Sequence, residues 1–85
     1  MNRPFDYALN VLSDLDRAID AKDFTALNHL LGRVVKHPRF IRSVEAMTPE
    51  CEGYTLARID AGWSLFRSLK AQMEAKLRAQ YGAEW

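Results

Sequence analysis

The sequence lacks the features of secreted and membrane-spanning proteins. Its single cysteine, Cys51, excludes a disulfide within the chain, and a reducing compartment is the simpler expectation. No stretch approaches the roughly 20 uncharged apolar residues that span a bilayer. Pro4 and Asp6 stand where a signal peptide needs a basic and then an apolar run. We therefore expect a soluble, cytoplasmic protein.

Neither sign of charge is in clear excess. The chain has 12 basic and 11 acidic residues, and the net charge of +1 gives no global attraction to nucleic acid or to an anionic membrane. Its 85 residues, 48% of them apolar, suffice for one compact core, and no linker, internal repeat or low-complexity tract divides them. The sequence therefore predicts a single domain over residues 1–85.

Groups for catalysis or metal binding are also scarce. His29 and His37 stand eight residues apart, not at the i, i+4 spacing that puts two ligands on one helix face. A lone cysteine without a CxxC pair gives no basis for a closed zinc site. Asp16 and Asp20 share a helix face, but a solvated acidic side explains them better than a metal site or an acid–base pair. Whether Cys51 and a histidine form a nucleophile depends on geometry. We predict no enzymatic activity, no metal site and no cofactor.

What the sequence does contain is helical periodicity, and no segment alternates as a strand would. A first helix is expected from about residue 4 to residue 21, and Asp23 is a suitable N-cap for a second, which ends at the KHP motif. A short third helix follows, and Thr48 precedes a fourth that continues to about Tyr81. These elements predict an all-α fold, a small bundle of three or four helices with a long C-terminal helix.

Apolar residues at helical spacing define the predicted core. The second helix has the most regular pattern, with leucine and valine at i, i+3, i+4, i+7 and i+8 from Leu27 to Val35. The inward-facing residues expected in the third helix are Phe40, Ile41, Val44 and Met47. The predicted core comprises Leu12, Leu15, Ile19, Leu27, Leu30, Leu31, Val34, Phe40, Ile41, Trp63, Phe66 and Met73.

The fourth helix has two unlike faces. Bulky residues cluster in one direction, at about 100° per residue, and form its expected core face: Ile59, Trp63, Phe66, Leu69, Met73 and Leu77. Small residues point almost directly away from that face, and we call them the small stripe: Ala57, Ala61, Ser64, Ser68, Ala71, Ala75 and Ala79. The small stripe either fills a solvent-facing side with good helix formers or lets a second helix approach closely. Both interpretations are open at the level of sequence.

The length of the fourth helix raises a packing problem. If helical throughout, residues 49–81 extend about 50 Å, whereas a compact domain of this size has a radius of gyration of about 12 Å. Two glycines, Gly53 and Gly62, permit a bend or mark a close approach. Either the helix breaks near Gly62 and folds back, or a partner covers the excess, and we favour the partner. The apolar side continues to the end of the chain through Met73, Leu77, Tyr81 and Trp85.

One segment is strongly basic. The stretch RVVKHPRFIR, residues 33–42, contains no acid and has four cations, Arg33, Lys36, Arg39 and Arg42. These side chains could bind an acidic protein surface or phosphates. They also suit simpler roles, because cations favour a helix C-terminus and the exposed side of a helix. Without a recognition-helix motif or stacking aromatics, the indication of nucleic-acid binding is weak.

Two surfaces are therefore left on which a function could lie, the small stripe and the basic stretch. We expect a non-catalytic protein-binding module that modulates or inhibits a larger protein or complex, as a monomer or a homodimer. Adaptors, chaperones and phage-type inhibitors are often built at this scale, which is an analogy of size and class. The expected partner is another protein. The alternative is a nucleic-acid-associated regulator that uses residues 33–42.

Overall fold

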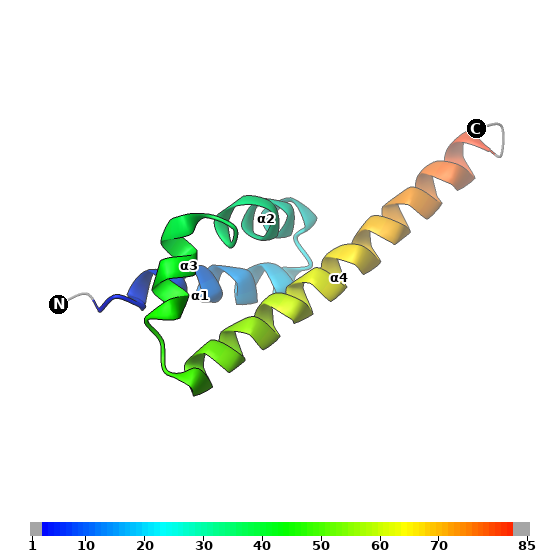
Figure 1. Ribbon diagram of the computed structural model, residues 1–85. Helices are drawn as coiled ribbons and strands as arrows, with labels where there is room; N and C mark the ends of the chain where they lie inside the picture. Colours follow the sequence, from blue (N-terminus) through cyan, green and yellow to red (C-terminus); the bar gives the residue numbers. More distant parts are fainter. Residues whose placement is uncertain (1–2, 83–85) are drawn as a thin grey trace.

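The structure, a computed structural model, describes residues 3–82 and is helical almost throughout (Figure 1). Helix α1 spans Asp6–Ala21. Helix α2 spans Phe24–His29 and runs directly into a short π-helix, Leu30–Val34. Helices α3 and α4 span Pro38–Glu45 and Pro49–Tyr81. The predicted all-α bundle with a long C-terminal helix is confirmed, and residues 3–82 contain no strand.

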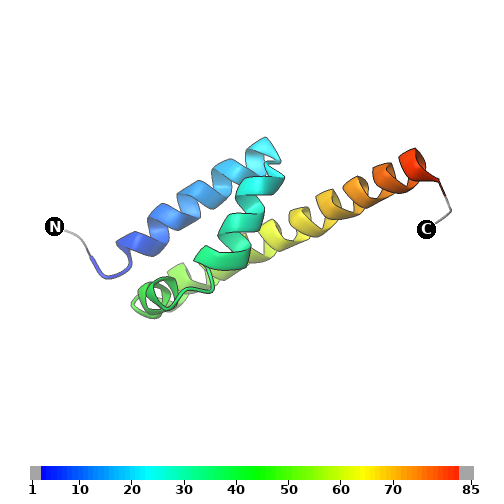
Figure 2. The same cartoon turned by 90° about the horizontal axis from the view of Figure 1, so that it is seen from above.

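The three shorter helices pack on the first half of α4. Helix α1 contacts α2, the π-helix, α3 and α4, and it runs in roughly the same direction as α4 (Figures 1 and 2). Helix α2 crosses between them, and α3 lies at the end where α1 and α4 begin (Figure 2). Because α4 continues well past the others, the molecule measures 56 × 20 × 18 Å and has a radius of gyration of 15.8 Å.

Polar side chains fix the starts of three helices. Asp23, His37 and Thr48 each accept a hydrogen bond from a backbone N–H in the first turn of the helix that follows, at 3.1, 3.1 and 3.3 Å from the nitrogen. The Asp23 and Thr48 caps were expected from the sequence, and each satisfies a donor that has no partner within its helix. The first helix begins at Asp6 rather than Pro4.

The second predicted helix is interrupted by the π-helix. Its signature is the hydrogen bond from the Val35 N–H to the Leu30 carbonyl, five residues earlier, at 3.0 Å. Leu30 and Leu31 are buried, whereas Val34 and Val35 are only half-buried. The regular spacing of apolar residues predicted the helix but not its wider turn.

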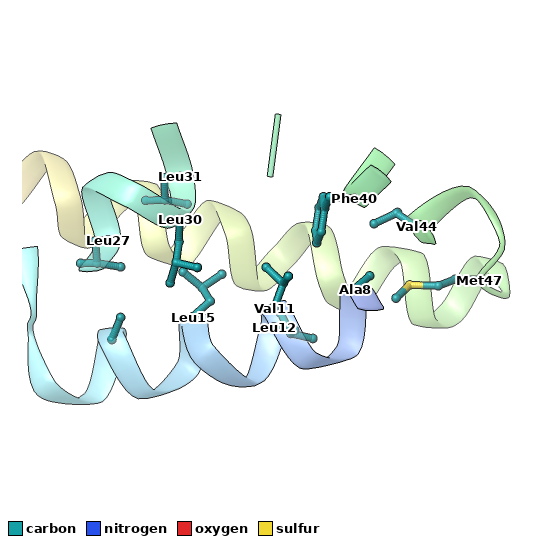
Figure 3. Close-up of a cluster of buried hydrophobic side chains, with 11 residues drawn as sticks. Ala8, Val11, Leu12, Leu15, Leu27, Leu30, Leu31, Phe40, Val44 and Met47 are labelled. Carbon is teal, nitrogen blue, oxygen red and sulfur yellow. The ribbon is translucent and has the colours of Figure 1, made fainter. Parts of the chain in front are cut away.

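The core lies between α1, α2 with the π-helix, and α3, closed by α4 (Figure 3). Two predicted core residues are wrong, since Ile41 is 45% exposed and Met73 is 47% exposed. The predicted Ile19, Val34, Trp63 and Phe66 are half-buried at its edge. The buried hydrophobic residues are Ala8, Val11, Leu12, Leu15, Ala18, Leu27, Leu30, Leu31, Phe40, Val44 and Met47.

A polar residue, Ser43, takes an inward position on α3 and leaves Ile41 on the outside. The Ser43 hydroxyl accepts a hydrogen bond from the Ala8 N–H at 3.0 Å and donates one to the Pro4 carbonyl at 2.9 Å. The Ala8 N–H belongs to the first turn of α1 and has no partner within that helix. Phe5, at the N-cap of α1, offers no side-chain hydrogen bond. Ser43 therefore caps α1 from another helix.

Replacing Ser43 with alanine should lower the free energy of unfolding by about 1.5 kcal/mol, because it leaves the buried Ala8 N–H without an acceptor. Urea denaturation followed by circular dichroism measures the change. Ser13→Ala, on the exposed side of α1, is the matched control and should be neutral or slightly stabilising. Equal stability of Ser43→Ala and the wild type would contradict the capping role.

Helix α4 is continuous through both of its internal glycines, so the predicted alternative of a break near Gly62 with the chain folding back is wrong. Gly62 instead marks a close approach. It is buried, and a Cβ atom there would lie 3.1 Å from Leu15 Cδ1 and 3.5 Å from Leu31 Cδ2. At Gly53 a Cβ atom would meet nothing within 4 Å. The missing side chain at Gly62 lets α4 settle against α1 and the π-helix.

Contacts at the edge of the core hold α4 in place. The rings of Phe24 and Phe66 stack with centroids 4.8 Å apart, and Trp63 meets Phe66 edge to face at 5.7 Å. An ion pair also joins α4 to α1, with Arg58 Nη2 and Asp16 Oδ1 2.7 Å apart. The Asp16 carboxylate, by hydrogen bonding and charge, raises the pKa of the Arg58 guanidinium.

Candidate functional site

The C-terminal part of α4 extends beyond the body of the protein. We call residues 70–81 the arm, and every one of them is exposed. Figures 1 and 2 both show this orange to red segment with no other helix beside it. The reason is length, since the 33 residues of α4 extend about 50 Å and the 16 residues of α1 only about 24 Å. The rest of the chain is too short to cover the arm.

The arm continues the same face by which α4 packs on the body. Thr55 and Gly62 are buried on that face, and Ile59, Phe66 and Leu69 are half-buried around them. At helical spacing the face then reaches three more apolar residues, which we call the apolar face of the arm. These are Met73, Leu77 and Tyr81, exposed by 47, 52 and 60%. The sequence assigned Met73 and Leu77 to the core face of the helix. They do lie on the face that packs on the body, but beyond the part of it that the described chain covers.

Charged residues border the apolar face. The arm has a net charge of +2, because it contains three basic residues, Lys70, Lys76 and Arg78, and one acidic residue, Glu74. All four side chains are exposed. An apolar strip with a polar border is the usual composition of a protein-binding surface.

The small stripe lies on the opposite side of α4 and follows it along nearly its whole length. Ala61 is half-buried, and the other six residues, Ala57, Ser64, Ser68, Ala71, Ala75 and Ala79, are exposed. Within the single chain the small stripe therefore faces solvent, which both of its interpretations allow.

The four cations of the basic stretch do not all line one site. Lys36 Nζ lies 5.8 Å from the centroid of the Trp63 ring, and Arg33 is exposed on the π-helix. Arg39 and Arg42 lie farther along, on α3, and line a cleft beside the start of α1. The structure therefore brings Arg39 and Arg42 together in one cleft, whereas Arg33 and Lys36 lie outside it.

Of the residues that line this cleft, the sequence indicated only Arg39 and Arg42 as site residues, and it missed the others, Arg3 and Tyr7 among them. The Arg39 guanidinium carbon lies 4.0 Å from the centroid of the Tyr7 ring, and Arg3 lines the cleft from the segment before α1. No local pattern could have found this group, because Tyr7 and Arg39 are brought together only when α3 packs on α1.

The side chains considered for catalysis make separate structural contacts and do not form one site. Asp16 is engaged by Arg58, and the His37 Nδ1 accepts the Arg39 N–H. Cys51 is exposed in the first turn of α4, and within residues 3–82 no hydrogen bond joins it to a histidine. In the same range, no group of three or more His, Cys, Asp or Glu side chains could hold a metal ion.

No helix in the described part of the chain combines the length and the apolar character needed to cross a membrane. Comparison with models of protein families, with curated proteins and with solved structures finds no match to this chain.

Proposed function

We propose that this chain is a non-catalytic protein-binding module that modulates or inhibits a larger protein or complex, and that the arm is its main recognition element. One observation carries the proposal. The face that packs on the body continues in register into the arm, where Met73, Leu77 and Tyr81 are all about half exposed or more. A partner helix or groove could continue the packing that the body begins.

The physical argument rests on the pattern rather than on exposure alone. Single exposed leucines are ordinary on protein surfaces. Three large apolar residues at i, i+4 and i+8 form a strip, and amphipathic helices bind hydrophobic grooves through residues at such spacings. An isolated helix of about 12 residues is marginally stable in water. The helical state of the arm is therefore stabilised by its continuity with residues 49–69 of α4, and a bound partner would stabilise it further.

The two faces of the arm allow two different contacts. The apolar face suits a groove on a foreign protein, and the small stripe suits close approach of a second α4 in a homodimer. Positions 75 and 77 separate these contacts, because Ala75 and Leu77 lie on different faces and both are exposed. Substitutions at both positions should leave the fold intact.

The experiment compares Leu77→Glu with Ala75→Glu as matched arm variants. Affinity capture from a lysate of the source cells, with and without nuclease, identifies the retained protein, and titration then measures its affinity. We expect Leu77→Glu to weaken that complex by about tenfold or more, because it buries a charge in the contact. We expect Ala75→Glu to leave it unchanged and to reduce self-association, measured by sedimentation, if the small stripe pairs.

Two results would overturn the proposal. One is capture and affinity that do not change with Leu77→Glu. The other is retention that disappears with nuclease and falls steeply with salt, which would favour the nucleic-acid regulator, because phosphate contacts release counterions.

A further inference from the structure

A cleft of about 410 Å³ lies between the start of α1 and the side of α3 that faces it. The side chains that define it are Arg3, Asp6, Tyr7, Asn10, Arg39 and Arg42. Its volume is within the range of small-molecule sites, about 300 to 1,000 Å³. The elements that line it, the start of α1 and α3, lie at the opposite end of the molecule from the arm (Figure 1), so the protein-docking proposal does not explain the cleft.

Three guanidinium groups in this cleft are held by contacts that leave donors unused. Arg39 lies over the Tyr7 ring, which occupies the face of the guanidinium and leaves its N–H edge open. Arg42 donates from Nε to the Pro38 carbonyl at 3.4 Å, and its terminal nitrogens remain available. Arg3 has its Nε 3.4 Å from Asp6 Oδ1. Each arginine is thus partly oriented before any anion arrives.

Charge in the cleft is not balanced. Among the described residues, Asp6 is the only acidic side chain that lines the cleft. It is already engaged by Arg3, through the Nε contact and through the Arg3 backbone N–H at 2.8 Å from Oδ2. Within residues 3–82, neither Arg39 nor Arg42 has a carboxylate within salt-bridge distance. Three arginines against one aspartate leave a charge of +2, and the positive end of the α1 dipole adds to it.

We propose that this cleft binds the dianion of a phosphate monoester. A dianion matches the uncompensated charge, and the planar guanidinium edges of Arg39 and Arg42 suit paired hydrogen bonds to phosphate oxygens. A carboxylate or a phosphodiester, each with one negative charge, would match only half of it. The volume beyond a phosphate group, bordered by Tyr7 and Asn10, leaves room for a small organic group attached to it.

The test titrates phenyl phosphate into the full-length protein near pH 7.5, where the phosphate monoester is mostly doubly ionised. Amide resonances in two-dimensional NMR report where it binds. We expect saturable shifts around Tyr7, Asn10 and Arg39, with a dissociation constant on the order of 1 mM for so small a probe. Methyl phenyl phosphate, the monoanionic diester, should bind about tenfold more weakly, since it loses one charge-assisted interaction.

Variants separate the cleft from general basicity. Arg39→Gln and Arg42→Gln should each weaken phenyl phosphate binding by about ten- to a hundredfold. Arg39→Lys keeps the charge and the fold but lacks the planar edge, and it should also bind more weakly. Arg33→Gln, from the same basic stretch but outside the cleft, should bind as the wild type does.

Three results would overturn the proposal. The first is the absence of saturable shifts up to about 20 mM phenyl phosphate, well above the expected dissociation constant. The second is equal loss of binding in Arg33→Gln and Arg39→Gln, which would mean diffuse attraction by the basic stretch. The third is equal affinity for the monoester and the diester, which would indicate contact with nucleic-acid backbone instead.

Discussion

Replacing Leu15 with alanine should lower the free energy of unfolding by about 3 kcal/mol. The Leu15 side chain is fully buried, and its Cδ1 atom lies where α4 packs on α1, 3.1 Å from the place of a Cβ atom at Gly62. The substitution removes apolar contacts and leaves a cavity that rigid neighbours fill only in part. For a domain of this size, a loss of 1 kcal/mol lowers the melting temperature by about 4–8 °C, so we expect a decrease of roughly 12–24 °C.

Leu77→Ala is the matched control for this prediction. It removes the same atoms from the exposed arm, where the side chain is 52% exposed, and should change stability by no more than about 0.5 kcal/mol. Thermal and urea unfolding measure both variants. A large loss in Leu77→Ala would mean that the arm is packed in solution, and a small loss in Leu15→Ala would contradict the position of the core.

Much of the fold could be predicted because local rules determine it. The Asp23 and Thr48 caps depend on atoms a few residues apart, and the helices that they begin follow from apolar spacing. The orientation of α4 also followed from spacing, since Ile59, Trp63 and Phe66 of its predicted core face pack against the core. The point at which this face becomes exposed depends instead on how far the other helices extend along α4. Spacing within α4 does not contain that length, so the prediction that Met73 is a core residue was wrong.

What could not be predicted depends on contacts between distant segments. Ser43 is inward because α1 needs a hydrogen-bond acceptor at the Ala8 N–H, a need that no pattern within α3 reveals. An interpretation based on hydrophobicity therefore turned Ile41 inward. The cleft between α1 and α3 also depends on contacts between distant segments. The basic stretch was evident in the sequence, but the Tyr7 ring that orients Arg39 comes from α1. Spacing predicts faces, and only packing shows which faces meet.

Replacing Gly62 with leucine should lower the free energy of unfolding by about 3 kcal/mol, because even the first added atom would lie 3.1 Å from Leu15 Cδ1. The larger side chain must push α4 away from α1 and the π-helix. In a Trp85→Phe background, Trp63 is the only tryptophan, so its fluorescence reports whether the docked half of α4 has moved. Gly53→Leu makes the same change in open space and should stabilise the protein by roughly 0.5–1 kcal/mol, through helix propensity.

The two core substitutions should also interact. Leu15→Ala opens space at the point where the Gly62→Leu side chain needs it, so the double variant should be more stable than the sum of the two single losses implies, by about 1 kcal/mol or more. Such coupling requires that the two positions share one volume. Simple additivity in urea unfolding would mean that they do not, and the close approach of α4 to α1 at Gly62 would be wrong. The packing of residues 49–69 on the body also determines where the exposed arm begins. The same measurement therefore tests whether the arm starts where the structure places it.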